Sequence, residues 1–208
     1  MNTLAIEPEP SIRPVFSRKM MMGVVVLALI TILLTWRARV LELTLERQSQ
    51  EPELVNKAAP DFAAATLDGQ TVRLADFRGQ KKVVVSFWAS WCGPCRLEMP
   101  ELVKFYKAHH TQDSDFELLA VSIDDDAKAA ADFATSEKLN FPVLLDPQQK
   151  MANAFGVDGI PTLFVIDKNG KITYGHIGYD GIMQYSLANA LGIDLTRQKG
   201  AQDGGSGH

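Results

Sequence analysis

Hydrophobic and polar positions divide the chain into one long apolar run near its start and a series of short apolar runs after it. Residues 20–36, MMMGVVVLALITILLTW, contain no charged side chain. Seventeen helical residues span about 25 Å, near the short end of what crosses a bilayer. Arg18, Lys19 and Arg37 border the run, and Trp36 suits a membrane interface. The pattern predicts an uncleaved transmembrane anchor over 20–36.

Two other interpretations of this run are a cleaved signal peptide and a buried core helix. The apolar run is long for a signal peptide, and no small-residue cleavage motif follows it. The positive-inside rule leaves the orientation of an anchor open, because three basic residues lie on each side. They are Arg13, Arg18 and Lys19 before the run and Arg37, Arg39 and Arg47 after it.

The rest of the chain outside 59–195 is predicted to be tails and a linker. Residues 1–19 and 196–208 are expected to be flexible tails, since they are rich in proline at one end and glycine at the other. Residues 37–58 are expected to form a juxtamembrane linker. Its first part fits a helix by composition and a strand by the alternation of its leucines, so its structure stays open.

Within 59–195, short apolar runs alternate with segments of helical spacing. Asp68-Gly69 predicts a hairpin turn, and Asp180 is expected to cap a last helix that ends at Gly192. Strands are predicted at 83–88, 116–123, 141–145, 162–167 and 171–178, and helices at 92–110, 124–139, 149–156 and 180–190. This alternation predicts an α/β fold with helices on both faces of a mixed sheet, closed by antiparallel strands.

Charge and cysteine content exclude several classes of function. The chain has a net charge of −4, and residues 59–195 carry 12 basic against 18 acidic residues, so a nucleic-acid surface is not expected. Two cysteines are too few for a disulfide-stapled scaffold or a cysteine-rich zinc site. His109 and His110 have no spacing that joins them to the cysteines as ligands. No metal and no cofactor are expected.

The two cysteines, Cys92 and Cys95, stand three positions apart where a buried strand gives way to a helix. The free amides of a first helical turn favour a negative sulfur at Cys92, which lowers the pKa of its thiol and makes it the accessible nucleophile. Cys95 would lie beside it, one turn deeper, and resolve a mixed disulfide. Gly93 leaves room for another chain, and Pro94 is tolerated in the first turn.

The alternative is a disulfide that only staples the start of the helix. A loop this short constrains little chain entropy, so its stabilising value would be small. Trp91, directly before the pair, suits a surface that binds a partner better than a buried staple. A catalytic dithiol that becomes a Cys92–Cys95 disulfide is therefore the favoured interpretation.

A second short motif, GIPTLFVID, places Ile160-Pro161 just before a predicted strand. Such a bond is a candidate cis peptide in a tight turn. A cis proline at Pro161 would expose the backbone of Ile160, which could pair with an extended substrate segment. The alternative is an ordinary trans proline at the start of an edge strand.

Five motifs follow one another along the chain: AAPDF, DGQTVRLADFRGQ, VVVSFWASWCGPCRLEMPEL, VSID and GIPTLFVIDKNGKI. Together they resemble the membrane-anchored TlpA/ResA/DsbE group of thioredoxin-fold proteins. The resemblance covers about 59–192 and implies a thioredoxin-like fold with an N-terminal hairpin and a helix and strand inserted at 125–147. It also implies that Glu98, three residues after the second cysteine, exchanges a proton with Cys95. Thioredoxin itself has a buried Asp where this chain has Ser86.

An anchor combined with a Gly-Pro active site predicts a reductase that works outside the cytoplasm. Thioredoxin, with the same Gly-Pro pair, has a potential near −270 mV, and disulfides persist mainly in oxidising compartments. The expected location is a bacterial inner membrane, crossed once by 20–36, with the catalytic domain on the periplasmic side. The resemblance implies disulfide-containing protein substrates, such as those of cytochrome c maturation or cytochrome oxidase assembly, and an electron donor of the DsbD/CcdA type.

Other functions remain open at this stage. An oxidase or isomerase of the same fold would carry the same cysteine pair, and a non-enzymatic module could use only the groove beside Pro161 to hold partners. A peroxiredoxin is disfavoured because Ala89 stands where that class needs Thr. A copper carrier would need a different cysteine spacing.

Overall fold

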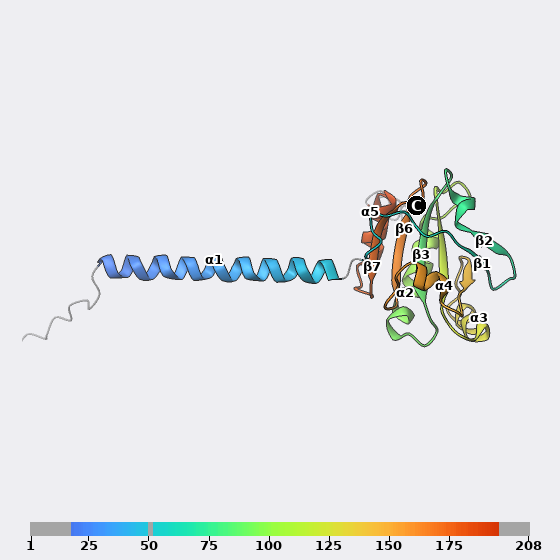
Figure 1. The fold of residues 1–208 in the computed structure, drawn as a ribbon, viewed down its shortest axis with the longest axis horizontal. Helices are drawn as coiled ribbons and strands as arrows, with labels where there is room; N and C mark the ends of the chain where they lie inside the picture. The colour runs from blue at the N-terminus through green and yellow to red at the C-terminus, as the bar shows by residue number, and fades with distance from the viewer. Residues whose placement is uncertain (1–17, 50–51, 196–208) are drawn as a thin grey trace, which may run out of the picture. The chain divides into compact units, whose positions relative to one another are not determined.

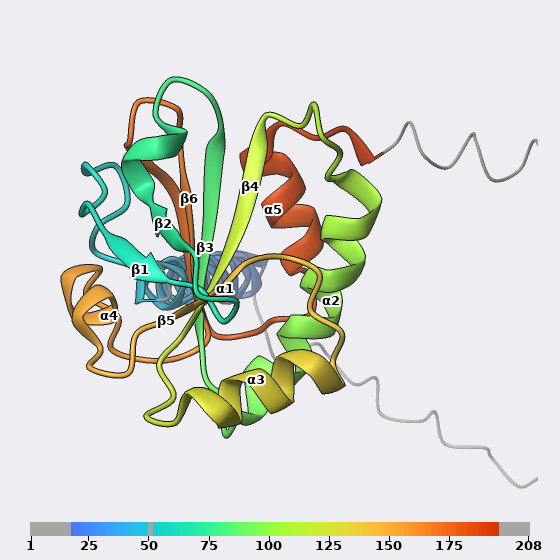
Figure 2. The same cartoon turned by 90° about the vertical axis from the view of Figure 1, so that its right-hand side faces the viewer.

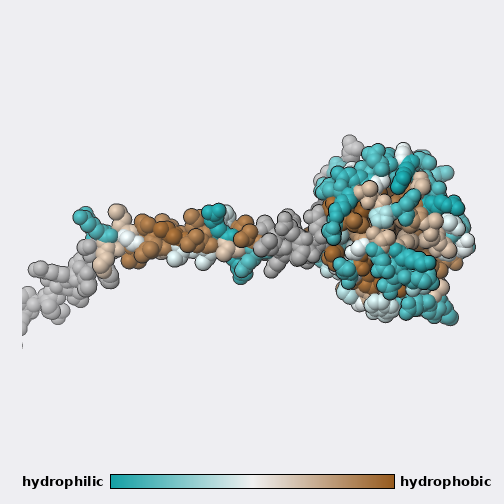
Figure 3. Space-filling model, in the orientation of Figure 1, coloured by the Kyte–Doolittle hydropathy of each residue, from teal (hydrophilic) through white to brown (hydrophobic). Residues whose placement is uncertain are grey.

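A computed structural model describes residues 18–49 and 52–195, in two separate units, Met1–Gln48 and Ser49–His208. The first unit holds one helix, α1 (Arg18–Ser49). Its stretch Arg18–Glu42 has a mean hydropathy of 2.1 and meets the length and composition of a membrane span, and Figure 3 shows apolar residues along it. The expected tails cover 1–19 and 196–208; residues 1–17 and 196–208 lie outside the described residues, whereas Arg18 and Lys19 belong to α1. The first part of the range expected as a linker is helical rather than extended.

The second unit is built on a five-stranded sheet in the order β5-β4-β3-β6-β7 (Figure 1). The parallel strands are β3 (Lys82–Trp88), β4 (Phe116–Ser122) and β5 (Val143–Leu145). The antiparallel strands are β6 (Thr162–Ile166) and β7 (Ile172–Ile177). The mixed sheet expected from the sequence is confirmed. The central strands β3 and β6 are buried on both faces, which is why their sequences are almost continuously apolar.

Helices cover one face of the sheet, and smaller elements cover the other (Figure 2). The helical face carries α2 (Gly93–His109), α3 (Ala127–Ser136) and α5 (Met183–Leu191). The other face carries the hairpin β1 (Ala63–Ala65) and β2 (Thr71–Arg73), the short helix η1 (Leu74–Phe77) and α4 (Lys150–Ala154). Two apolar cores, one on each face, therefore hold the sheet.

The segment directly before the domain docks on the edge strand β7. The Asn56 N–H donates to the Ile172 carbonyl at 2.8 Å, and the Ile172 N–H donates to the Lys57 carbonyl at 2.9 Å. A side chain at Gly175 would come within 2.9 Å of Pro52 and Val55. Glycine at 175 thus allows this segment to close the sheet edge, which would otherwise present unpaired backbone groups.

Two local expectations are corrected by the structure. Helix α5 begins at Met183 with Ile182 as its N-cap, and Asp180 instead accepts a hydrogen bond from the Ile182 N–H at 3.0 Å. The helical spacing of apolar residues in the sequence predicts one apolar face of α2 formed by Met99, Leu102, Val103 and Tyr106. In the structure Phe105 is buried beside Met99 and Leu102, while Val103 and Tyr106 are only half-buried. The side of α2 that faces the sheet carries Cys95, Glu98 and Phe105.

Candidate active site

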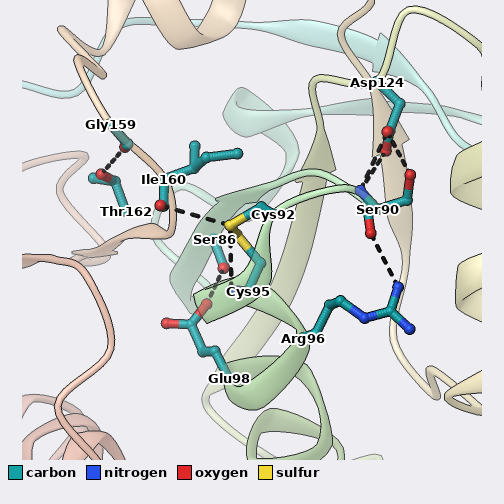
Figure 4. Close-up of a disulfide and its surroundings, with 10 residues drawn as sticks. All are labelled: Ser86, Ser90, Cys92, Cys95, Arg96, Glu98, Asp124, Gly159, Ile160 and Thr162. Carbon is teal, nitrogen blue, oxygen red and sulfur yellow. Dashed lines mark hydrogen bonds between the residues drawn. A yellow bond between two sulfur atoms is a disulfide. The ribbon is translucent and has the colours of Figure 1, made fainter.

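The two sulfurs lie at the junction of β3 and α2, where the sheet ends and the helix begins. Cys92 and Cys95 form a disulfide, and Cys92 is the N-cap of α2 (Figure 4). The backbone N–H of Cys95 lies 3.2 Å from Cys92 Sγ, so an amide of the first turn points at that sulfur as the sequence predicts. The same amide would stabilise a negative charge on Cys92 after reduction.

The sequence predicts an accessible Cys92, whereas the structure leaves only 4% of this residue exposed. The reason is the turn before β6, which covers the disulfide: Cys92 Sγ lies 3.6 Å from the carbonyl oxygen of Ile160. Cys95 is fully buried, so it is the deeper of the two, as expected. A partner sulfur must therefore approach along the one edge of Cys92 that remains open.

Exposed residues surround that edge. The Trp91 side chain is 68% exposed, and Gly93 and Pro94 are exposed as well. A side chain built at Gly93 would meet nothing within 4 Å, so the space that the sequence assigns to a partner chain is present. These three residues present an open surface next to the sulfur.

The Ile160–Pro161 peptide bond is cis, which confirms the sequence prediction. The turn is tied on both sides: the Thr162 hydroxyl donates to the Gly159 carbonyl at 2.6 Å, and the Gly178 N–H donates to the Pro161 carbonyl at 2.7 Å. Figure 4 shows the Ile160 carbonyl pointing at the Cys92 sulfur. Two segments distant in sequence thus meet at the disulfide.

Glu98 is almost fully buried, with 1% of the residue exposed, on the sheet side of α2. The Ser86 hydroxyl donates a hydrogen bond to Glu98 Oε2 at 3.1 Å. Burial raises the pKa of the Glu98 carboxyl to about 8, the Ser86 hydrogen bond opposes this rise, and the negative charge of Asp180 adds to it. The carboxyl lies below the disulfide in Figure 4. Glu98 is therefore a buried carboxyl with a raised pKa and not a solvated helix residue.

Ser86 is a residue whose role the sequence did not predict; it stood out only as a departure from the buried Asp of thioredoxin. Ser86 is fully buried in β3 and holds Glu98 in place. A signal was available, since Ser86 is the one polar residue in the apolar run VVVSFW.

Asp124 is a second residue that the sequence reasoning missed. It is 3% exposed and accepts hydrogen bonds from the Ser90 N–H at 3.0 Å, the Ser90 hydroxyl at 2.7 Å and the Ser122 hydroxyl at 2.8 Å. Arg96 donates to the Ser90 carbonyl at 3.1 Å. These bonds hold the loop that carries Trp91 into the first turn of α2 (Figure 4).

Within residues 18–49 and 52–195, no three His, Cys, Asp or Glu side chains come together as a metal site. The expectation of no metal and no cofactor stays a prediction. The chemistry that the geometry can support is exchange of a dithiol and a disulfide, with one buried carboxyl available to take or give a proton.

Comparison with known proteins agrees with this geometry. Residues 54–191 match the Redoxin family. The chain is 42% identical over 118 residues to the thiol-disulfide oxidoreductase ResA of Geobacillus thermodenitrificans, which covers 57% of this chain and 66% of that protein. The match thus spans just under two thirds of the relative's length.

Solved structures resemble the domain as well. A candidate thiol:disulfide interchange protein DsbE from Chlorobium tepidum is 34% identical with a TM-score of 0.56, over 68% of this chain and 94% of that one. StoA from Bacillus subtilis is 28% identical with a TM-score of 0.54, over 63% and 96%. The expected thioredoxin-like fold is confirmed. The chain belongs to the Redoxin family, and its domain is of the ResA and DsbE thiol-disulfide oxidoreductase type.

Proposed function

We propose that this chain reduces disulfides of other proteins through Cys92 and Cys95 while α1 tethers it to a bacterial inner membrane. The observation that carries the proposal is the disulfide at the start of α2, which faces the cis Ile160–Pro161 turn and lies above the buried Glu98. A staple would need neither an exposed tryptophan beside it nor a buried carboxyl with a raised pKa.

The reaction begins from the dithiol form. The Cys92 thiolate, stabilised by the Cys95 N–H, attacks one sulfur of a substrate disulfide and forms a mixed disulfide. The other substrate sulfur leaves as a thiolate and takes a proton from water. The open edge beside Trp91 and Gly93 admits the substrate, and the Ile160 backbone turn lies against the reacting sulfur.

Resolution of the mixed disulfide needs a second thiolate, at Cys95. Ionised Glu98 takes the proton of the Cys95 thiol, and the Cys95 sulfur then attacks the Cys92 sulfur. A Cys92–Cys95 disulfide forms, and the reduced substrate leaves as a thiolate that water protonates. Since the pKa of Glu98 is about 8 in the disulfide form, the carboxyl keeps that proton near neutral pH until the enzyme is reduced again.

Direction and location follow from general redox chemistry. The Gly93-Pro94 pair is the one in thioredoxin, whose potential near −270 mV suits a reductant. Disulfides persist outside the cytoplasm, so we place the domain on the periplasmic side. Tethering by α1 would keep the domain close to a membrane donor of the DsbD/CcdA type at high effective concentration. Substrates would include cysteines of cytochrome c maturation or of cytochrome oxidase assembly.

Trapping of substrates tests the proposal. A Cys95→Ala protein cannot resolve its mixed disulfide, so it should stay covalently linked to its substrate through Cys92 until a thiol reductant is added. Cys92→Ser should lower insulin reduction to the uncatalysed rate. The double variant Cys92→Ser, Cys95→Ala is the control and should trap nothing. Mass spectrometry of the linked proteins would identify the substrate.

Two results would contradict the proposal in different ways. Effects on partner proteins that are undiminished in Cys92→Ser would remove the enzymatic function and leave a partner-binding module. An equilibrium potential near −120 mV, against the expected −270 mV, would reverse the direction and make the protein an oxidase.

A further inference from the structure

A row of side chains extends the site sideways across the sheet, from Ser86 on β3 to His176 on β7. Ser86 pairs with Leu163 on β6, and Leu163 pairs with His176. Residues directly opposite in adjacent strands point to the same face, and strands lie about 4.8 Å apart, so His176 stands about 10 Å from Ser86 on the face covered by α2 and α5. Because Ser86 holds Glu98 on that face, His176 belongs to the surroundings of the Glu98 carboxyl.

His176 lies next to a charged residue, Asp180, at the outer edge of this row. Its Nε2 lies 3.6 Å from Asp180 Oδ2, and the two side chains are 14% and 34% exposed. Nε2 is buried and has no hydrogen-bond partner within the described residues. Asp180 Oδ1 accepts from the Ile182 N–H, and Gly178 donates to the Pro161 carbonyl, so the loop that carries Asp180 is held by α5 and by the cis turn.

The other groups around Glu98 come from three elements. Tyr174 on β7 is half-buried, and its pKa is raised mainly by burial, with the charges of Asp180 and Glu98 adding to the rise. On α2, Cys95 is disulfide-bonded, and Glu101 is paired with Lys104 and accepts from Gln184 of α5. The pKa of the Glu98 carboxyl is raised first by burial, and the negative charge of Asp180 adds to that rise.

We propose that Asp180 is a positioning residue for the proton of Glu98: its carboxylate adds to the effect of burial in holding that proton on Glu98 between turnovers. A fixed negative charge at the edge of a buried site disfavours a second negative charge inside it. Asp180 touches neither sulfur, and it acts only through Glu98. The inference deepens the proposed function and rests on it for turnover, whereas the coupling between the two carboxyls stands by itself.

Titration of Glu98 by NMR tests the coupling directly. The full chain in detergent micelles, oxidised so that no thiol titrates, is labelled with ¹³C at glutamate carboxyls, and the Glu98 signal is assigned by its loss in Glu98→Gln. Asp180→Asn should move the midpoint of the Glu98 titration from about 8 downward by about half a pH unit. The midpoint should stay near its original value in Asp180→Glu, which keeps the charge.

A matched control removes the same charge elsewhere. Asp113 is exposed in the loop before β4, at the end of the sheet away from the disulfide, so Asp113→Asn should leave the Glu98 midpoint unchanged. An unchanged midpoint in Asp180→Asn would overturn the inference, and so would an equal shift in Asp113→Asn.

The pH profile of insulin reduction separates this inference from the proposed function. In Asp180→Asn, we expect the limb of the profile that follows Glu98 to move to lower pH together with the NMR midpoint. A shifted midpoint with an unshifted profile would uphold the coupling and overturn the role of Glu98 in turnover.

Discussion

Two buried carboxylates of the active-site region, Asp124 and Glu98, have opposite surroundings. Asp124 accepts hydrogen bonds from the Ser90 N–H and from two serine hydroxyls. Glu98 is at least as buried, yet among residues 18–49 and 52–195 its carboxyl receives one hydrogen bond, from Ser86. Hydrogen bonds to a carboxylate compensate the loss of water, so Asp124 is held as part of the structure of the active-site loop. Glu98 lacks that compensation, which is why its pKa rises to about 8.

The comparison teaches that burial alone does not identify a functional carboxyl. What distinguishes Glu98 is the small number of hydrogen-bond donors around its carboxyl. With few donors to stabilise the negative charge, the carboxyl binds a proton more readily. Such a group can take up and release that proton near neutral pH, whereas a carboxylate with many donors serves to fix the loop that carries it. Three substitutions test this difference.

The largest effect should come from Glu98→Gln. In the unfolded chain Glu98 would titrate near 4.5, and in the folded oxidised protein near 8. The folded state therefore binds the Glu98 proton more tightly than the unfolded chain does. The stability that this proton contributes is complete below about pH 4.5 and is lost as the pH rises through 8. Glu98→Gln should remove this loss of stability at high pH, which amounts to up to about 5 kcal/mol of the unfolding free energy.

Urea unfolding of the oxidised full chain at several pH values, in mild detergent, measures this effect. The same substitution should flatten the pH dependence of insulin reduction between about pH 6 and 9. A Glu98→Gln protein whose stability and turnover follow the original pH profiles would remove Glu98 from the mechanism.

A smaller effect, of a different kind, is expected for Asp124→Asn. The amide cannot accept from Ser90 and Ser122 as the carboxylate does, which should cost about 2–3 kcal/mol of unfolding free energy. The pH dependence of turnover should keep its shape, because Asp124 is bonded to the loop serines and has no role in the proposed proton transfer. Urea unfolding together with a pH profile checks both parts. A shifted profile would show that the two carboxylates are not different in function.

The smallest effect should come from Ser86→Ala. Loss of the hydroxyl removes the hydrogen bond that opposes burial, so the pKa of Glu98 should rise further, and stability should fall by about 1 kcal/mol. The limb of the pH profile that follows Glu98 should move to higher pH. Ser122→Ala is the matched control, since Ser122 is equally buried and donates to Asp124. It should cost similar stability and leave the profile in place.

The sequence by itself determined the elements and the reactive pair. Apolar spacing marked β3, β4 and β6 and the start of α2, because strand and helix periodicities are local properties of the chain. The cysteine spacing placed both sulfurs on one helical turn, and the proline before β6 marked the cis turn. These features depend on residues a few positions apart, which a linear pattern records.

Only the tertiary structure decided how these parts meet. Ser86 and Glu98 are twelve positions apart, Ser90 and Asp124 are thirty-four apart, and Cys92 and Ile160 are sixty-eight apart. Which face of α2 meets the sheet determines that Glu98 is buried with one donor, and the packing of the turn before β6 determines how little of Cys92 is open. Burial and charge act through space, so a pKa and an accessible sulfur follow from the folded arrangement and not from the order of residues.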